Sequence, residues 1–140
     1  MKNKYFLLLL IIIIASFFRL YNLPSTPPGL YPDEAMNGNN ALEANTTGEY
    51  KVFYPENNGR EGLYINIQAV FLKFLPNTPE TLRLPSALFG ILTVLGLYLL
   101  TGQLFKHHKY KNEIALLASF LLAVSFWHIN FSRIDRKSVV

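Results

Sequence analysis

The longest uncharged stretch of the chain is the feature that most limits its fold. Leu84 to Phe105 contains no Asp, Glu, Lys or Arg over 22 positions. A helix needs about 20 apolar residues to cross the hydrocarbon core of a bilayer, which is roughly 30 Å thick. Ile114 to Ser132 adds a second uncharged stretch of 19 residues. Both stretches therefore predict transmembrane helices.

A third apolar stretch, Tyr5 to Phe18, lies near the N-terminus and consists mainly of Leu and Ile. It reaches spanning length if Arg19 extends to the interface and residues 20–23 are included. The alternative is a cleaved signal peptide, because lysines precede an apolar core of suitable length. We favour a retained helix, since the small pair Ala15-Ser16 is followed by bulky residues that make a poor cleavage site.

These stretches predict an all-α integral membrane fold made of the N-terminal transmembrane helices of a larger bundle. We expect spans at about 5–22, 84–105 and 114–132, joined by a helical outer loop at 23–83. Strand content should be close to nil, because a spanning segment must satisfy every backbone group internally.

Basic residues at the ends of the apolar stretches predict the orientation. Lysines precede the first stretch and separate the second from the third, and cytoplasmic flanks carry such an excess. We therefore expect a multi-pass protein of the inner or plasma membrane with a cytoplasmic N-terminus. The segment from Pro24 to Arg83 would lie outside, and it carries seven acids against four bases: Asp33, Glu34, Glu43, Glu49, Glu56, Glu61 and Glu80 against Lys51, Arg60, Lys73 and Arg83.

The formal net charge of +4 reflects this topology, and no basic patch is interleaved with stacking aromatic residues. We therefore expect no nucleic-acid partner. The chain has no cysteine. Disulfides, thiolate metal sites and a cysteine nucleophile are thereby excluded.

The last six residues, 135–140, read Asp-Arg-Lys-Ser-Val-Val. Followed by a stop codon, this run matches one reading frame of a widely used sequencing adapter. We expect an assembly artefact that begins near Ile134, and residues 1–134 would then be the N-terminal piece of a longer protein. A complete three-span protein is the alternative.

Proline and glycine divide the outer loop into segments. The proline-rich run at 23–29 predicts an extended tether, because proline lacks an amide donor and restrains the residue before it. We expect helices near Asp33 to Thr47, with Gly48 at the C-cap, and near Leu63 to Leu75. The second and third spans should be helical near Leu84 to Phe105 and near Glu113 to Phe131.

Two adjacent carboxylates, Asp33 and Glu34, follow the tether directly. Asp33 could serve as an N-cap, whose side chain accepts an amide at the start of the next helix. Alternatively, one carboxylate could act as a general base or a metal ligand at the membrane face. Both roles are compatible, because a cap also positions its side chain rigidly.

Four segments in order resemble the N-terminal portion of a known enzyme family: "FFRLYNLPSTPPGLYPDEA", "YPENNGREGLYINIQAVFLKFL", "RLPSALFGILTVLGLYLL" and "NFSRI". The family comprises bacterial membrane glycosyltransferases of the protein-mannosyltransferase and aminoarabinose-transferase type, within the C-type glycosyltransferase superfamily. The resemblance covers Phe17 to Ile134. Many relatives carry proline where Gly62 stands, which is one departure from the pattern.

The resemblance implies that Asp33 is the catalytic carboxylate, that Glu34 assists it, and that the donor is a sugar on a polyprenyl phosphate. A lipid phosphate needs cations at the membrane surface, and we expect Arg60 first, then Arg133 and Arg19, to bind it. An arginine at a membrane edge can also be a simple interfacial anchor. No metal ligands are predicted, and a divalent cation as cofactor is left open.

The function expected from the resemblance is transfer of a sugar to a hydroxyl of a protein, lipid or glycan acceptor on the extracytoplasmic side. A fragment of this length should be inactive alone, because the bundle that holds the lipid donor is incomplete. The alternative is a small non-enzymatic membrane subunit or a transporter fragment. Extending the gene past the codon for Ile134 separates the two, since roughly eight or more further helices would support the enzyme.

The predicted orientation can be tested with single cysteines, because the chain has none of its own. An impermeant thiol reagent applied to intact cells should label Asn57→Cys and should not label His108→Cys. The reverse pattern would overturn the orientation.

Overall fold

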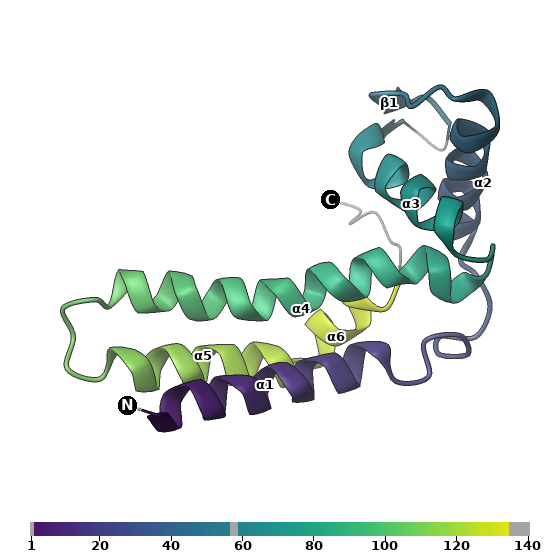
Figure 1. The fold of residues 1–140 in the computed structure, drawn as a ribbon. Coiled ribbons are helices and arrows are strands. Elements are labelled where there is room, and N and C mark those ends of the chain that lie inside the picture. The colour runs from purple at the N-terminus through teal and green to yellow at the C-terminus, as the bar shows by residue number, and fades with distance from the viewer. Residues whose placement is uncertain (1, 57–58, 135–140) are drawn as a thin grey trace. The chain divides into compact units, whose positions relative to one another are not determined.

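The structure, a computed structural model, describes residues 2–56 and 59–134 and is mostly helical. The residues 135–140, which we expect to be an artefact, lie outside the described residues. Figure 1 shows the elements, which are α1 (Lys2–Leu20), α2 (Pro32–Thr47), β1 (Phe53–Tyr54), β2 (Arg60–Glu61), α3 (Gly62–Phe74), α4 (Pro79–Leu104), α5 (Lys111–Val124) and α6 (Phe126–Ser132).

The chain forms two compact units. The first, called the bundle unit, consists of Met1–Tyr21 and Ala87–Arg133. Most of the second, called the loop unit, is Asn22–Ser86. Helix α4 begins in the loop unit and continues into the bundle unit.

Small side chains form the centre of the bundle unit. The buried residues Ile11, Ala15, Val94 and Ala123 bring together α1, α4 and α5. Alanine at a helix contact lets the two backbones approach closely, which is the usual way in which membrane helices pack. Large apolar residues instead cover the outward faces, where Leu92, for example, is 57% exposed.

Among the described residues, α1 and α4 are each long and apolar enough to cross a membrane. The apolar stretch in α1 runs over Asn3–Leu20, close to the predicted first span. Helices α5 and α6 provide a third candidate only if the two together count as one span.

The predicted start of the second span was wrong, because α4 begins at Pro79 and contains Pro85. The amide of Leu82 and that of Thr81 both donate to the carbonyl of Thr78, at 3.3 and 3.1 Å. Thr78-Pro79-Glu80 is a typical helix start, with proline in the first turn and an acid beside the positive end of the helix. The prediction of a helix start near Leu84 overlooked this signal.

The third predicted helix, Glu113 to Phe131, is interrupted. Helix α5 ends at Val124, Ser125 is extended with φ −62° and ψ 119°, and α6 is bent from α5 by 61°. The stretch from Ile114 to Ser132 contains neither proline nor glycine. The interruption is therefore not caused by a proline or a glycine.

In the loop unit, α2 begins and ends as the sequence predicts to within one residue. Pro32 is the first helical residue, where a missing amide costs nothing. Gly48 has φ +78° at the C-cap, and its amide donates to the carbonyl of Ala44 at 2.9 Å. This left-handed conformation is one that glycine adopts without strain.

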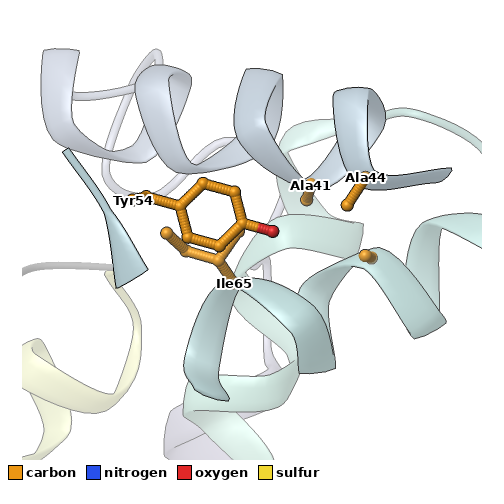
Figure 2. Packing of buried hydrophobic residues seen from close by; sticks show 5 residues of the cluster. Ala41, Ala44, Tyr54 and Ile65 are labelled. Carbon is orange, nitrogen blue, oxygen red and sulfur yellow. The ribbon is translucent and has the colours of Figure 1, made fainter. Parts of the chain in front are cut away.

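A two-residue antiparallel ribbon, β1 and β2, pairs Tyr54 with Arg60. It is the only strand pairing in the part of the chain that the structure describes, and it agrees with the expectation of almost no strand. The ribbon places Tyr54 over a small core between α2 and α3 (Figure 2), whose buried residues are Ala41, Ala44, Tyr54, Ile65 and Ala69.

Gly62 is needed where the ribbon meets α3. Its amide donates to the carbonyl of Val52 at 2.7 Å. A Cβ atom at this position would run into the carbonyl oxygen of Lys51. A proline at this position would lose the hydrogen bond and meet the same obstruction, so the ribbon depends on glycine here.

We therefore expect Gly62→Ala to destabilise the loop unit by about 1–3 kcal/mol, the usual cost of overpacking. The measurement is the rate at which trypsin cleaves after Lys51 in the detergent-solubilised protein. Gly96→Ala is the control, because nothing lies within 4 Å of its added Cβ. Equal cleavage rates in the two variants would show that the ribbon tolerates the methyl group.

Candidate functional site

Asp33 lies in the first turn of α2 and forms an ion pair with Arg60. Its Oδ1 is 3.0 Å from Nη2 of Arg60, and its side chain is 32% exposed against 6% for the arginine. The N-cap of α2 is Tyr31. The interpretation of Asp33 as an N-cap was therefore wrong, because the helix begins one residue before it.

Arg60 is held by more than this carboxylate. Its Nη1 donates to the side-chain oxygen of Asn37 and, at 3.4 Å, to the backbone carbonyl of Asp33. Asn37 lies one turn after Asp33 on α2, so the two side chains share a face. The arginine is thus fixed beneath the exposed carboxylate. Sequence reasoning missed Asn37, which the spacing of four residues from Asp33 could have indicated.

Glu34 differs completely from its neighbour. Its side chain and that of Arg83 are both fully buried. Nε of Arg83 donates to Oε1 and Nη2 to Oε2, each at 3.0 Å. The backbone amide of Tyr31 also donates to Oε2 at 2.9 Å. Glu34 therefore closes the start of α2 and forms a two-bond ion pair, which is the strongest geometry that arginine and a carboxylate adopt.

Arg83 also fastens the tether to this pair. Its guanidinium donates to the carbonyls of Leu23 at 3.3 Å, of Pro27 at 2.9 Å and of Gly29. These carbonyls lie outside the helices and strands and therefore have no partner within a regular element. We counted Arg83 among the bases of the outer segment and did not predict this role. The signal was the proline-rich run itself, which has few amides to pair with its own carbonyls.

The other two predicted phosphate-binding residues lie in the bundle unit. Arg19 is fully buried near the end of α1 and donates to main-chain carbonyls of α1 and α5 and to His128. Arg133 is 8% exposed, and its Nη1 donates to the carbonyl of Phe18 at 2.7 Å. The structure thus brings Asp33, Glu34 and Arg60 together in one unit and Arg19 and Arg133 in the other.

Within the described ranges, no group of three or more His, Asp or Glu side chains could hold a metal ion. The loop unit contains a cavity of about 260 Å³ that is lined by none of the predicted site residues. Its lining is Leu23, Leu75, Pro76, Thr78, Glu80, Thr81 and Leu84.

Comparison of the chain with protein-family models, with curated proteins and with solved structures finds no match. The roles of Asp33, Glu34 and the three arginines consequently stay predictions. Their geometry nevertheless separates the two carboxylates, since one is accessible and the other is enclosed.

Removal of the buried charge of Glu34 should destabilise the loop unit. We expect Glu34→Gln to lower the free energy of unfolding of the loop unit by about 3–5 kcal/mol, because it leaves a buried guanidinium without its counter-charge. Proteolysis in increasing urea would measure this. Asp33→Asn should cost clearly less, because its carboxylate is partly in water.

Glu43→Gln is the matched control on the same helix. Glu43 hydrogen-bonds the exposed Lys51 at 3.0 Å and raises the pKa of that lysine. Its replacement should leave the unfolding midpoint unchanged. If Glu34→Gln and Glu43→Gln lower the free energy of unfolding equally, the buried ion pair of Glu34 with Arg83 does not stabilise the loop unit.

Proposed function

We propose that the chain is the N-terminal part of a membrane glycosyltransferase that uses a polyprenyl-phosphate sugar donor. The observation that carries the proposal is the Asp33–Arg60 pair, a partly exposed carboxylate on a buried arginine. A general base must be reachable by the acceptor and rigidly held. Asp33 meets both conditions, whereas Glu34 meets only the second.

The bundle unit supports a membrane location. Its outward faces carry large apolar side chains, among them Leu9 at 56% and Leu99 at 58% exposure. Continuous surfaces of this kind are an aggregation hazard in water and fit the acyl chains of lipids. The charge bias of the flanking segments supports a cytoplasmic N-terminus, and the loop unit would then face the extracytoplasmic side.

In the proposed reaction, a hydroxyl oxygen of the acceptor attacks the anomeric carbon of the donor sugar. Asp33 takes the proton of that hydroxyl as the new carbon–oxygen bond forms. The bond from the anomeric carbon to the phosphate oxygen breaks on the opposite side, and polyprenyl phosphate leaves with the electron pair. The anomeric configuration is therefore inverted.

The other charged residues take supporting roles in this proposal. Arg60 orients Asp33 through their ion pair, and Glu34 acts as a positioning residue because its carboxylate is engaged with Arg83. Arg60 is the best candidate to meet the leaving phosphate, since it is the one predicted phosphate-binding arginine that lies in the same unit as Asp33. Arg19 is 0% exposed and bonds main-chain carbonyls of α1 and α5, so it could do so only by giving up some of these bonds. Arg133 is the second candidate.

The test is sugar transfer in vitro from a polyprenyl-phosphate donor by the longer protein that the sequence analysis expects. Asp33→Asn keeps the size of the side chain and should reduce transfer by roughly 10² or more, as expected for loss of a general base. Glu43→Gln, the exposed control on α2, should transfer at the wild-type rate.

Equal transfer by the wild type and both variants would mean that Asp33 is not the base. If the wild-type extended protein transfers no sugar from any lipid-linked donor, the result would instead favour the non-enzymatic subunit or the transporter fragment.

A further inference from the structure

The break between α5 and α6 has no cause in its local sequence. Sharp bends in helices arise at proline, at glycine and serine pairs, at bulges of the helix, or where a side chain inserts into the hydrogen-bond ladder. Proline and glycine are absent from 111–134, and Ser125 is a single serine. Insertion of a side chain from another helix is the cause that the contacts support.

The inserted side chain is that of Arg19 on α1. Its Nη2 donates to the carbonyl of Leu122 at 3.3 Å, and its Nη1 donates to that of Ala123 at 3.1 Å. In a continuous helix these two carbonyls would accept the amides four residues on, those of Phe126 and Trp127. At the break, the carbonyl of Leu122 accepts the amide of Ser125 at 3.3 Å instead, and the guanidinium binds two carbonyls that lack these helical partners.

The same guanidinium also holds the far side of the break. Nη2 of Arg19 lies 2.7 Å from Nδ1 of His128, in the first turn of α6. Because arginine has only donors, Nδ1 is the acceptor and the imidazole proton is on Nε2. One side chain therefore binds the end of α5 and the start of α6 at once.

A buried guanidinium needs a counter-charge, and the end of α5 supplies one. Arg19 is 0% exposed, and no carboxylate pairs with it among the described residues. The last carbonyls of a helix carry a partial negative charge that favours a cation. Helix α4 leaves room for the group at Gly90, where a Cβ would lie 3.1 Å from Nε of Arg19.

We infer that Arg19 is the C-terminal cap of α5 and the lock that keeps the third apolar stretch divided at Ser125. Without it, Lys111 to Ser132 forms one continuous helix, because its own amides then satisfy the carbonyls of Leu122 and Ala123. This role is independent of sugar transfer, and its test needs no activity.

The test reads the backbone at Ser125 by NMR of the whole chain in detergent micelles or nanodiscs. Labelling with ¹³C-serine and ¹⁵N-phenylalanine selects the Ser-Phe pairs, which begin at Ser16, Ser119 and Ser125. Ser16 in α1 and Ser119 in α5 are helical and act as internal references, whereas Ser125 is extended. The wild type should therefore show two helical Cα shifts and one extended shift.

In Arg19→Leu, the Ser125 Cα shift should move to the helical range of the two references. Arg133→Leu is the matched control, since Arg133 is also a buried arginine of the bundle unit and its Nη1 donates to the carbonyl of Phe18 in α1. It should leave Ser125 extended. An extended Ser125 in Arg19→Leu, with both references still helical, overturns the inference.

A folding failure would be recognised, because the reference shifts would then leave the helical range. In that case the Ser125 Cα shift of Arg19→Lys is measured in the same way. Its ammonium keeps the charge but lacks the planar fork that reaches both carbonyls and His128. The Ser125 shift should move part of the way toward the helical range, and an unchanged shift overturns the inference.

Discussion

Buried guanidinium groups that donate to main-chain carbonyls hold this chain together where its helices end. A carbonyl that leaves a helix and stays buried must find a donor. Arg83 supplies donors to the non-helical tether, through the carbonyls of Leu23, Pro27 and Gly29. Arg19 supplies them for the end of α5. In a membrane this requirement is stricter, because no water can replace the missing partner.

The same requirement narrows the candidates for binding a lipid phosphate. An arginine that already satisfies several backbone acceptors can turn to a ligand only if those acceptors find other donors. Arg19 and Arg83 are in that position, since each bonds three or more groups of the protein. Arg60 also bonds Asn37 and the backbone carbonyl of Asp33, and it differs only in that its ion-pair partner, the carboxylate of Asp33, is partly exposed. A ligand that contacts the carboxylate of Asp33 would therefore contact Arg60 before Arg19 or Arg83.

The sequence was sufficient for the existence and approximate bounds of the helices, because those depend on local apolar runs and on Pro32 and Gly48. It was insufficient for the break at Ser125, which depends on a side chain more than a hundred positions away. The start of α4 at Pro79 was readable from Thr78 and Glu80 but was passed over. In the site, the carboxylate pair could be identified, whereas its partners could not, since Arg60 and Arg83 reach it only through the tertiary fold.

The unequal surroundings of Asp33 and Glu34 follow from helix geometry. Successive residues of an α-helix point about 100° apart, so two neighbours in a first turn cannot both face the same partner. Once the tether and Arg83 enclose one of them, the other is directed to a different side of α2. Glu34 is enclosed, because its longer side chain can reach back to the amide of Tyr31 while it binds Arg83. The shorter Asp33 is left at the surface, where Arg60 limits its orientation. An Asp-Glu pair at the start of a helix can in this way combine a structural ion pair with an accessible carboxylate, and the structural member fixes the direction in which the accessible one points.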